Sequence, residues 1–140
     1  MAAEEINAAG GIDGRQIELV IRDDAADPQR AIGIANEFVD NASMVAVVGH
    51  ITSGATLAAA GIYNAVGNGI VSVSPTASSP LVTDAGQWTF RVCPSDLEHG
   101  PALASWLRET LGRRRAEVLY ANDAYGRGVV ESFARAFVGA

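Results

Sequence analysis

The sequence predicts an α/β fold with a mainly parallel sheet. Short runs rich in apolar and β-branched residues alternate with segments whose apolar residues recur at helical spacing, and this alternation implies right-handed crossovers. The run at 44–48 is apolar throughout, as in a parallel strand that is covered on both faces. Of the 140 residues, 49% are hydrophobic, which is enough to build the core of one domain or of pieces of two.

The N-terminal segment is predicted to contain a helix end, a turn and a strand. Residues 1–9 have the character of the tail of a helix, and the glycine pair at 10–11 is expected to stop it, because glycine readily adopts the left-handed backbone found there. The Asp-Gly pair at 13–14 is a turn signal. The apolar run at 17–21 then predicts a strand.

A helix is expected to follow this strand. Asp27 is a suitable helix cap, and Pro28 suits the first helical position because its missing N–H would have no partner there. The apolar residues beyond it recur at helical spacing and predict one buried face. These residues are Ala31, Ile34, Ala35, Phe38 and Val39.

The middle of the chain is predicted to contain three strands and one helix. The strands are expected at 44–48, 70–73 and 89–92, with an irregular stretch rich in Ser, Thr and Pro before the last of them. Ser53 is expected to cap the helix between the first two strands, and this helix should run to about Val66.

The last third is predicted to hold a helix, a strand, a turn and a second helix. Their expected positions are 97–111, 117–121, 122–126 and 128–138. The first of these helices places four large apolar side chains on one face, which we expect to be buried. They are Leu103, Trp106, Leu107 and Leu111.

Composition argues against several classes of protein. The net charge of −6 argues against nucleic-acid binding, and the basic trio at 113–115 is interpreted as a solvated turn. Cys93 is the single cysteine, so no internal disulfide can form, and its apolar neighbours predict a buried thiol. No segment is long enough to cross a membrane and none has the pattern of a signal peptide, so the chain as it stands is expected to be cytoplasmic.

Two loops of small hydroxyl residues are the best candidates for a ligand site. One follows the strand at 44–48 and contains Ser53, and the other follows the next strand and contains Thr76, Ala77 and Ser78. Loops at the carboxyl ends of strands in open α/β sheets line a ligand crevice. Backbone N–H groups at a helix start, with a serine hydroxyl, can receive a carboxylate, although helix capping explains Ser53 equally well.

Catalytic and metal-binding interpretations have less support. His50 lies near Ser53, but the pattern is no nucleophile elbow and no acid partner is evident, so His50 is expected to be a hydrogen-bonding loop residue. The carboxylates at 23, 24 and 27 are too few for a calcium loop, and capping explains the last of them. Tyr125, in the loop after a strand, either packs over the turn or forms an aromatic wall for a ligand.

Several motifs occur in an order that resembles one protein family. They are Ile6-Asn-Ala-Ala-Gly-Gly-Ile-Asp-Gly14, Asp23-Asp-Ala-Ala-Asp-Pro28, Val48-Gly-His50 followed by Ser53, Ser74-Pro75, and Asp123-Ala-Tyr-Gly126 followed by Gly128. In this combination the chain resembles the leucine/isoleucine/valine-binding family of type 1 periplasmic binding proteins, the solute receptors of ABC importers. The resemblance extends over nearly the whole chain.

The resemblance implies an organisation in two Rossmann-like α/β lobes. An incomplete first lobe would occupy 1–95, and 96–140 would be the first helix-strand-helix of the second. The family's first strand, most of its first helix and much of its second lobe have no counterpart in this sequence, so the chain is expected to be a fragment. Exposed lobe faces would allow a homodimer.

The same resemblance implies a ligand and the residues that bind it. The ligand would be a branched-chain amino acid or a related amino acid or amide, with an ABC permease as partner of the intact protein, a periplasmic location, no cofactor and no enzymatic activity. Ser53 would bind the ligand carboxylate with its hydroxyl and N–H, and Thr76 would offer its carbonyl to the ammonium. Ser78, next to Ala77, would bind the same head group, and Tyr125 would line the cleft from the second lobe.

Two other functions stay open from the sequence alone. A ligand-sensing domain of the same fold would control a signalling partner instead of serving a permease. A small serine hydrolase built on His50 and Ser53 has the least support, because no oriented acid of a triad is visible in the sequence.

Overall fold

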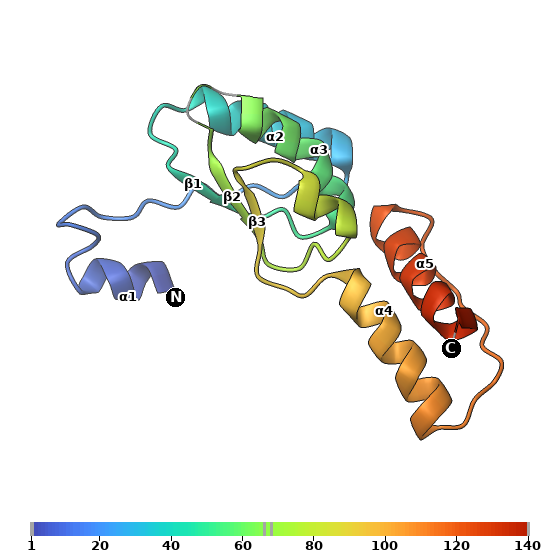
Figure 1. Ribbon diagram of the computed structural model, residues 1–140. Coiled ribbons are helices and arrows are strands. Elements are labelled where there is room, and N and C mark those ends of the chain that lie inside the picture. The colour runs from blue at the N-terminus through green and yellow to red at the C-terminus, as the bar shows by residue number, and fades with distance from the viewer. Residues whose placement is uncertain (1, 66, 68, 140) are drawn as a thin grey trace.

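A parallel sheet lies at the centre of the molecule (Figure 1). The computed structural model describes residues 2–65, 67 and 69–139. Within these residues the sheet has three strands in the spatial order β1 (Ala46–Val48), β2 (Val71–Ser74) and β3 (Thr89–Arg91). Both pairings are parallel, which confirms the predicted fold class.

Helices connect the strands and extend the chain beyond them. Their bounds are α1 (Ala2–Ala8), α2 (Pro28–Asp40), α3 (Ser53–Ala65), α4 (Asp96–Ser105) and α5 (Ala124–Gly139). A short 3₁₀ helix, η1 (Pro80–Asp84), precedes β3, and a π-helical turn, η2 (Trp106–Thr110), continues α4. The predicted helix end at Val66 lies outside the described residues.

The starts of α2 and α3 show one correct and one incorrect prediction of a cap. Asp27 caps α2 as expected, since its Oδ1 accepts from the N–H of Gln29 at 2.7 Å. In α3, however, Ser53 is the first helical residue and the residue before it has the capping role. The Thr52 hydroxyl accepts from the N–H of Ala55 at 3.3 Å. The side chain of Ser53 is therefore available for a different contact.

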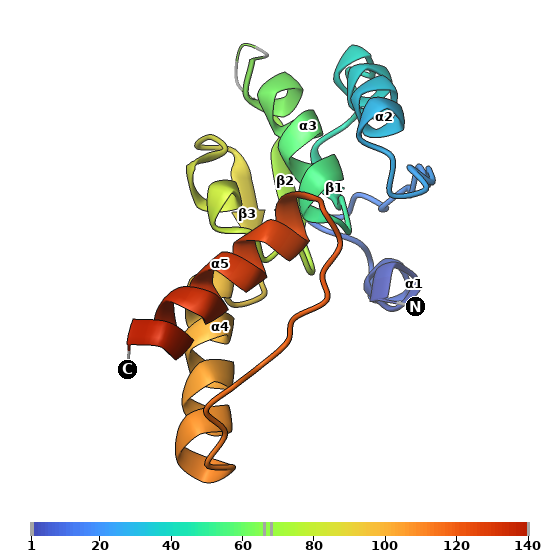
Figure 2. The same ribbon diagram turned by 90° about the vertical axis from the view of Figure 1, so that its right-hand side faces the viewer.

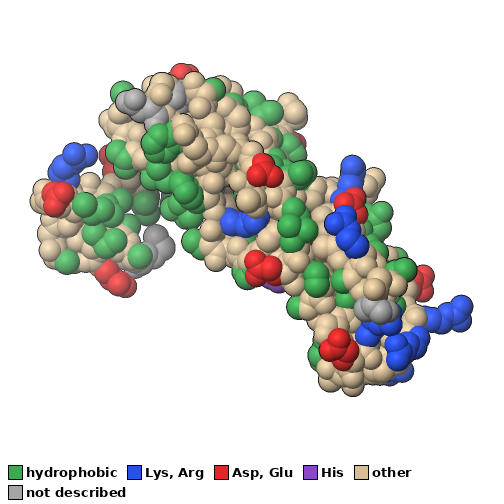
Figure 3. Space-filling model, in the orientation of Figure 1, with side chains coloured by type: hydrophobic (Ala, Val, Ile, Leu, Met, Phe, Trp, Pro, Cys, Tyr) green, Lys and Arg blue, Asp and Glu red, His purple; other side chains and the backbone are tan. Residues whose placement is uncertain are grey.

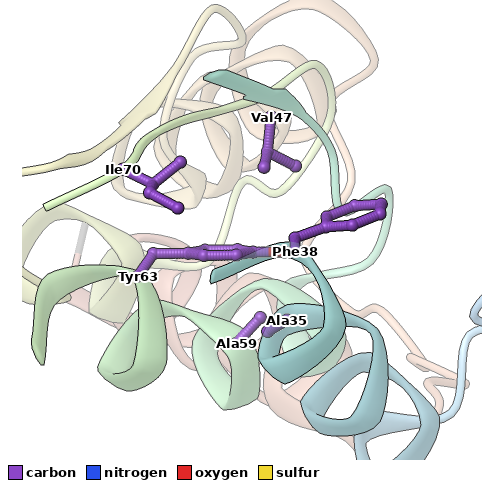
Figure 4. Packing of buried hydrophobic residues seen from close by; sticks show 6 residues of the cluster. All are labelled: Ala35, Phe38, Val47, Ala59, Tyr63 and Ile70. Atoms are coloured by element: carbon purple, nitrogen blue, oxygen red, sulfur yellow. The ribbon is translucent and has the colours of Figure 1, made fainter. Parts of the chain in front are cut away.

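The main core lies between β1 and the helices α2 and α3. It consists of Ala35, Phe38, Val47, Ala59, Tyr63 and Ile70 (Figure 4). In β1 only Val47 is buried, whereas Ala46 and Val48 are exposed. The prediction that this strand is covered on both faces is therefore wrong for this chain, because the helices that pack against it cover one face.

Helices α4 and α5 pack against each other in a second, smaller cluster, made of Ala104, Phe133 and Phe137 (Figure 2). The two phenylalanine rings stack with their centroids 5.2 Å apart. Of the four side chains predicted to form a buried face, only Leu107 packs against this cluster. Leu103, Trp106 and Leu111 are exposed, so this prediction is largely wrong.

Two predicted strands do not form. Residues 17–21 and 117–121 are irregular, without ladder pairing. The first of them is held by Asn7, whose Oδ1 accepts from the Ile17 N–H at 2.7 Å and whose Nδ2 donates to the Ile17 carbonyl at 2.8 Å. A strand requires ladder hydrogen bonds with a neighbouring strand, and neither run makes them among the described residues, although residues 18–24 lie beside β1.

The structure also tests the predictions for turns, helix ends and the exposure of single residues. The glycine pair at 10–11 ends α1 with positive φ angles of 107° and 78°, as expected. The turn at 13–14 is present, closed by pairing of Ile12 with Arg15. The final helix begins earlier than predicted, at Ala124, because the Asp123 carboxylate accepts from the Gly126 N–H at 2.8 Å. Cys93 is partly exposed instead of buried, and the basic trio at 113–115 is exposed as predicted.

Candidate functional site

The loops after β1 and β2 meet at the carboxyl ends of these strands. The Ser79 N–H donates to the Ser53 hydroxyl at 3.2 Å, and the Thr76 hydroxyl donates to the Ile51 carbonyl at 2.6 Å. A third bond runs from the Ser74 hydroxyl to the His50 carbonyl. The structure therefore brings the two predicted loops together as one unit.

Ser53 lies at the junction of the two loops and is 2% exposed. Its hydroxyl oxygen accepts from the second loop, which leaves the hydroxyl proton available for donation. The first N–H groups of a helix have no intrahelical partner. The Thr52 hydroxyl accepts from the N–H of Ala55, and the N–H groups of Ser53 and Gly54 have no hydrogen-bond partner among the described residues, so they can receive an anion.

The three predicted residues of the second loop differ in their exposure to solvent. Thr76 is exposed. Ala77 is completely buried and its N–H donates to the Ser74 hydroxyl at 3.1 Å, so it supports the loop from inside. Ser78 is also buried, and its carbonyl accepts from the Asp96 N–H at 2.9 Å, which connects the loop to the start of α4.

Tyr125 lies in the first turn of α5 with half of its surface exposed. This helix approaches the second loop closely at Gly128, where a Cβ atom would lie 3.1 Å from Pro80 Cδ. Figures 1 and 2 show α5 beside α4 and next to the body that carries the sheet. No hydrogen bond joins the Tyr125 side chain to the two loops in the part of the chain that the structure describes. The structure therefore places the helix that carries Tyr125 next to the predicted site.

His50 is a buried hydrogen-bonding residue, as the sequence predicts. Its Nδ1 lies 2.6 Å from Asp24 Oδ2, and its Nε2 lies 3.2 Å from the Tyr63 hydroxyl. Both ring nitrogens are thus paired with groups other than Ser53. This geometry does not support the serine hydrolase hypothesis, which requires the imidazole to accept the serine proton.

Asp24 is a functional candidate that the sequence did not single out as a partner of His50. The two residues are 26 positions apart, and Asp24 lies three positions after the end of the predicted strand at 17–21. The apolar run before Asp24 forms no strand, so the sequence held no signal for this pairing, which depends on how the segment passes the end of β1.

The neighbouring carboxylates serve the local backbone. Oδ1 atoms of Asp23 and Asp24 accept from the N–H groups of Ala25 and Ala26, each at 2.8 Å. Asp27 caps α2 as described above. Within the described ranges no group of three or more His, Cys, Asp or Glu side chains is arranged to hold a metal ion.

Asp96 is a buried acid that the sequence did not identify. It is completely buried, and neither carboxylate oxygen has a hydrogen-bond partner among the described residues. His99 approaches it from the same helix, with 3.6 Å between Nδ1 and Oδ1. The backbone of Asp96 connects α4 to both neighbours, since its N–H donates to Ser78 and its carbonyl accepts from the Ser132 hydroxyl at 2.7 Å.

A cavity lies beside β1 and reaches the start of the first loop, where Gly49, His50 and Ile51 form part of its lining. It has a volume of about 320 Å³ and is mostly lined by apolar residues of the segment 18–24, of β1 and its flanks, and of α2. Figure 3 shows hydrophobic side chains gathered where the N-terminal segment meets the body of the sheet. No helix among residues 2–65 or 69–139 is long and apolar enough to cross a membrane.

Comparison with known proteins gives matches along nearly the entire chain. The family model described as "Periplasmic binding protein" matches residues 1–139. An amino acid binding protein of Pseudomonas aeruginosa is 38% identical over 132 residues, which are 94% of this chain and 35% of the relative. The Leu/Ile/Val-binding protein homolog 1 of Brucella abortus is 35% identical over 131 residues, 93% of this chain and 34% of the relative.

A solved structure gives the same result for the fold. The branched-chain amino acid transporter substrate-binding protein of Streptococcus pneumoniae, in complex with isoleucine, superposes with a TM-score of 0.89 at 32% identity. The match covers 97% of this chain and 39% of that structure. The chain thus spans somewhat more than a third of the length of the proteins it matches. The agreement of sequence, sheet and helix arrangement over nearly every residue shows that the chain belongs to the periplasmic binding protein family, whose members bind solutes.

Proposed function

We propose that this chain forms the head-group side of an amino-acid site in the substrate-binding component of an ABC importer for branched-chain or related amino acids. The junction of the two loops supports this proposal most directly. Ser53 keeps a hydroxyl proton to donate, and the first N–H groups of α3 lie beside it. Such a set of donors suits the carboxylate that all amino acids share.

The relatives support the chemical class of the ligand. The Brucella protein is named for leucine, isoleucine and valine, and the Streptococcus structure contains isoleucine. In our proposal Ser53 binds the ligand carboxylate and the Thr76 carbonyl accepts from the ammonium. Ser78 binds the same head group with its hydroxyl and N–H, and the buried Ala77 holds the second loop in place. Tyr125 contributes an aromatic surface from α5.

The proposal extends to the whole protein. The complete receptor would lie outside the cytoplasm, close its two lobes over the amino acid and deliver it to an ABC permease. Under this proposal residues 1–95 belong to the first lobe and 96–140 to the second. Binding would be coupled to closure because ligand contacts from both lobes form only in the closed state.

The substitution Ser53→Ala in the full-length protein tests the role of the first loop. Losing a hydrogen bond to a charged group costs about 1.5–3 kcal/mol. We therefore expect leucine binding, measured by isothermal titration calorimetry, to weaken about 10- to 150-fold. Ser43→Ala, at an exposed serine in the turn before β1, is the matched control and should leave the affinity within a factor of about two.

Two results would contradict the proposal. Equal leucine affinities in the wild type and Ser53→Ala would remove Ser53 from the site. A wild-type protein that binds neither leucine, isoleucine nor valine, nor smaller amino acids such as alanine, would contradict the ligand class itself.

A further inference from the structure

We propose that His50 is a positioning residue for the two candidate ligand loops, with its ring fixed by Asp24 and Tyr63 and its carbonyl fixing both loops. The inference rests on the function proposed above. We call the three side chains Asp24, His50 and Tyr63 the histidine relay. Its contribution to binding is indirect, because its side chains are paired with one another behind the loops.

The ring of His50 is held from two directions. It is 7% exposed, with Asp24 on Nδ1 at 2.6 Å and Tyr63 on Nε2 at 3.2 Å. The two partners come from different parts of the fold, since Asp24 precedes α2 and Tyr63 lies in the third turn of α3. A rotation of the imidazole would break both contacts in a buried place, where unpaired polar groups are costly.

The chemistry of the relay assigns its protons. The Asp24 carboxylate accepts from Nδ1–H, so Nε2 of a neutral imidazole accepts from the Tyr63 hydroxyl. Burial raises the pKa of Tyr63 to about 12, and the negative charge of Asp24 adds to this shift. The phenol therefore keeps the proton that it donates to His50 throughout the neutral pH range.

The backbone carbonyl of His50 links the fixed ring to both loops through hydrogen bonds. Its carbonyl accepts from the Ser74 hydroxyl and from the Thr56 hydroxyl, the latter at 3.1 Å. Ser74 in turn accepts from the N–H of Ala77 in the second loop. The next carbonyl, that of Ile51, accepts from Thr76. A change in the orientation of the peptide at His50 would therefore move groups in both candidate loops.

The adjacent aspartates provide a matched pair of variants. Asp23 and Asp24 each accept a backbone N–H two residues ahead at 2.8 Å, but only Asp24 also reaches His50. Asp23→Ala and Asp24→Ala thus remove the same local bond, and only the second breaks the relay. In the full-length protein we expect Asp24→Ala to weaken leucine binding at least about 10-fold at a temperature where it remains folded, and Asp23→Ala to change it less than about twofold.

A proton NMR measurement on the 140-residue chain tests the relay independently of any ligand. We expect a slowly exchanging, downfield Nδ1–H resonance from His50 in water, because the 2.6 Å bond to a carboxylate is short and buried. The resonance should disappear in Asp24→Ala and in His50→Gln, and persist in Asp23→Ala and in His99→Gln. Its presence in Asp24→Ala would overturn the relay.

Tyr63→Phe gives a milder variant should Asp24→Ala fail to fold. It removes one hydroxyl and keeps the ring in the core, and we expect a loss of leucine affinity of about threefold to tenfold at a temperature far below unfolding. If wild-type protein binds leucine, and the folded relay variants bind it as tightly as Asp23→Ala, the positioning role is refuted while the proposed function stands. If wild-type protein binds no amino acid, the proposed function fails and the positioning role fails with it.

Discussion

Tyr63 is the residue in which the core and the candidate site meet. Its ring packs in the cluster formed by α2, α3 and β1, and it is 1% exposed (Figure 4). Its hydroxyl reaches His50, so the same side chain carries apolar packing on one side and the histidine relay on the other. Such a residue is expected to affect stability through its ionisation as well as through its volume.

The raised pKa of Tyr63 predicts that the folded chain loses stability in alkaline solution. Its pKa is about 12 in the folded chain, against 10.0 for an unperturbed tyrosine. Below pH 10 the side chain is protonated in both states. Between pH 10 and 12 the unfolded chain releases this proton first, so the free energy of unfolding falls as the pH rises. Chemical denaturation at several pH values should show a steeper fall for wild type than for Tyr63→Phe, and identical slopes would contradict the assignment.

The residues of the candidate site were partly predictable from the sequence. The position of Ser53 and of Thr76–Ser78 after two apolar runs was enough to place the loops together, because parallel strands end at one edge of a sheet. The capping role that we expected for Ser53 belongs to Thr52, since a shift of one residue at a helix start reassigns the hydroxyl. The pairing of Asp24 with His50 was not predictable, because it depends on how a segment without regular structure passes the end of β1.

At the scale of elements, α4 and α5 contact each other closely in the second part of the chain. The helices cross at Gly100, where a Cβ atom would collide with the Ser132 hydroxyl and with the N–H of Phe133. Ser132 also donates to the carbonyl of Asp96 at 2.7 Å. The absence of a side chain at Gly100 thus permits both the close approach and this hydrogen bond.

Gly100→Ala is expected to destabilise the chain. An added methyl group in a contact without free space typically costs about 1–3 kcal/mol. Gly61→Ala is the matched control, since Gly61 lies exposed within α3 and a Cβ atom there would meet nothing within 4 Å. This control should stabilise the chain by up to about 1 kcal/mol, the difference in helix propensity. Thermal unfolding followed by circular dichroism measures both changes, and a neutral Gly100→Ala would show that the helices can separate without cost.

Signals for the ends of helices act locally in the sequence, whereas the formation of a strand depends on distant residues. Helices α2 and α5 have capping aspartates and α1 has a glycine stop, and these signals act within one turn of the chain. The runs at 17–21 and 117–121 have strand composition but no ladder, since a strand depends on a partner elsewhere in the molecule. For the same reason Leu103 and Trp106 lie exposed although their spacing predicts a buried face.

At the scale of the whole molecule, the hydrogen-bonded loops differ from the outer edge of β1, which has no ladder partner among the described residues. The two loops are joined by hydrogen bonds among the described residues, whereas the outer edge of β1 borders the cavity of about 320 Å³. The chain spans 35% of the length of its Pseudomonas relative. Under the proposed function, the rest of such a receptor would supply further contacts to the ligand and would cover these surfaces.

The 140-residue chain is therefore expected to bind leucine much more weakly than the full-length protein. Each hydrogen bond to a charged group contributes about 1.5–3 kcal/mol, so the loss of two such bonds weakens binding roughly 10²- to 10⁴-fold. Titration of both proteins with leucine by calorimetry, or by NMR for the weaker one, measures the ratio. Equal affinities would mean that Ser53, Thr76, Ser78 and Tyr125 form a sufficient site by themselves. Lobe closure would then add no contacts to the head group, because every group that holds it would already be present in these 140 residues.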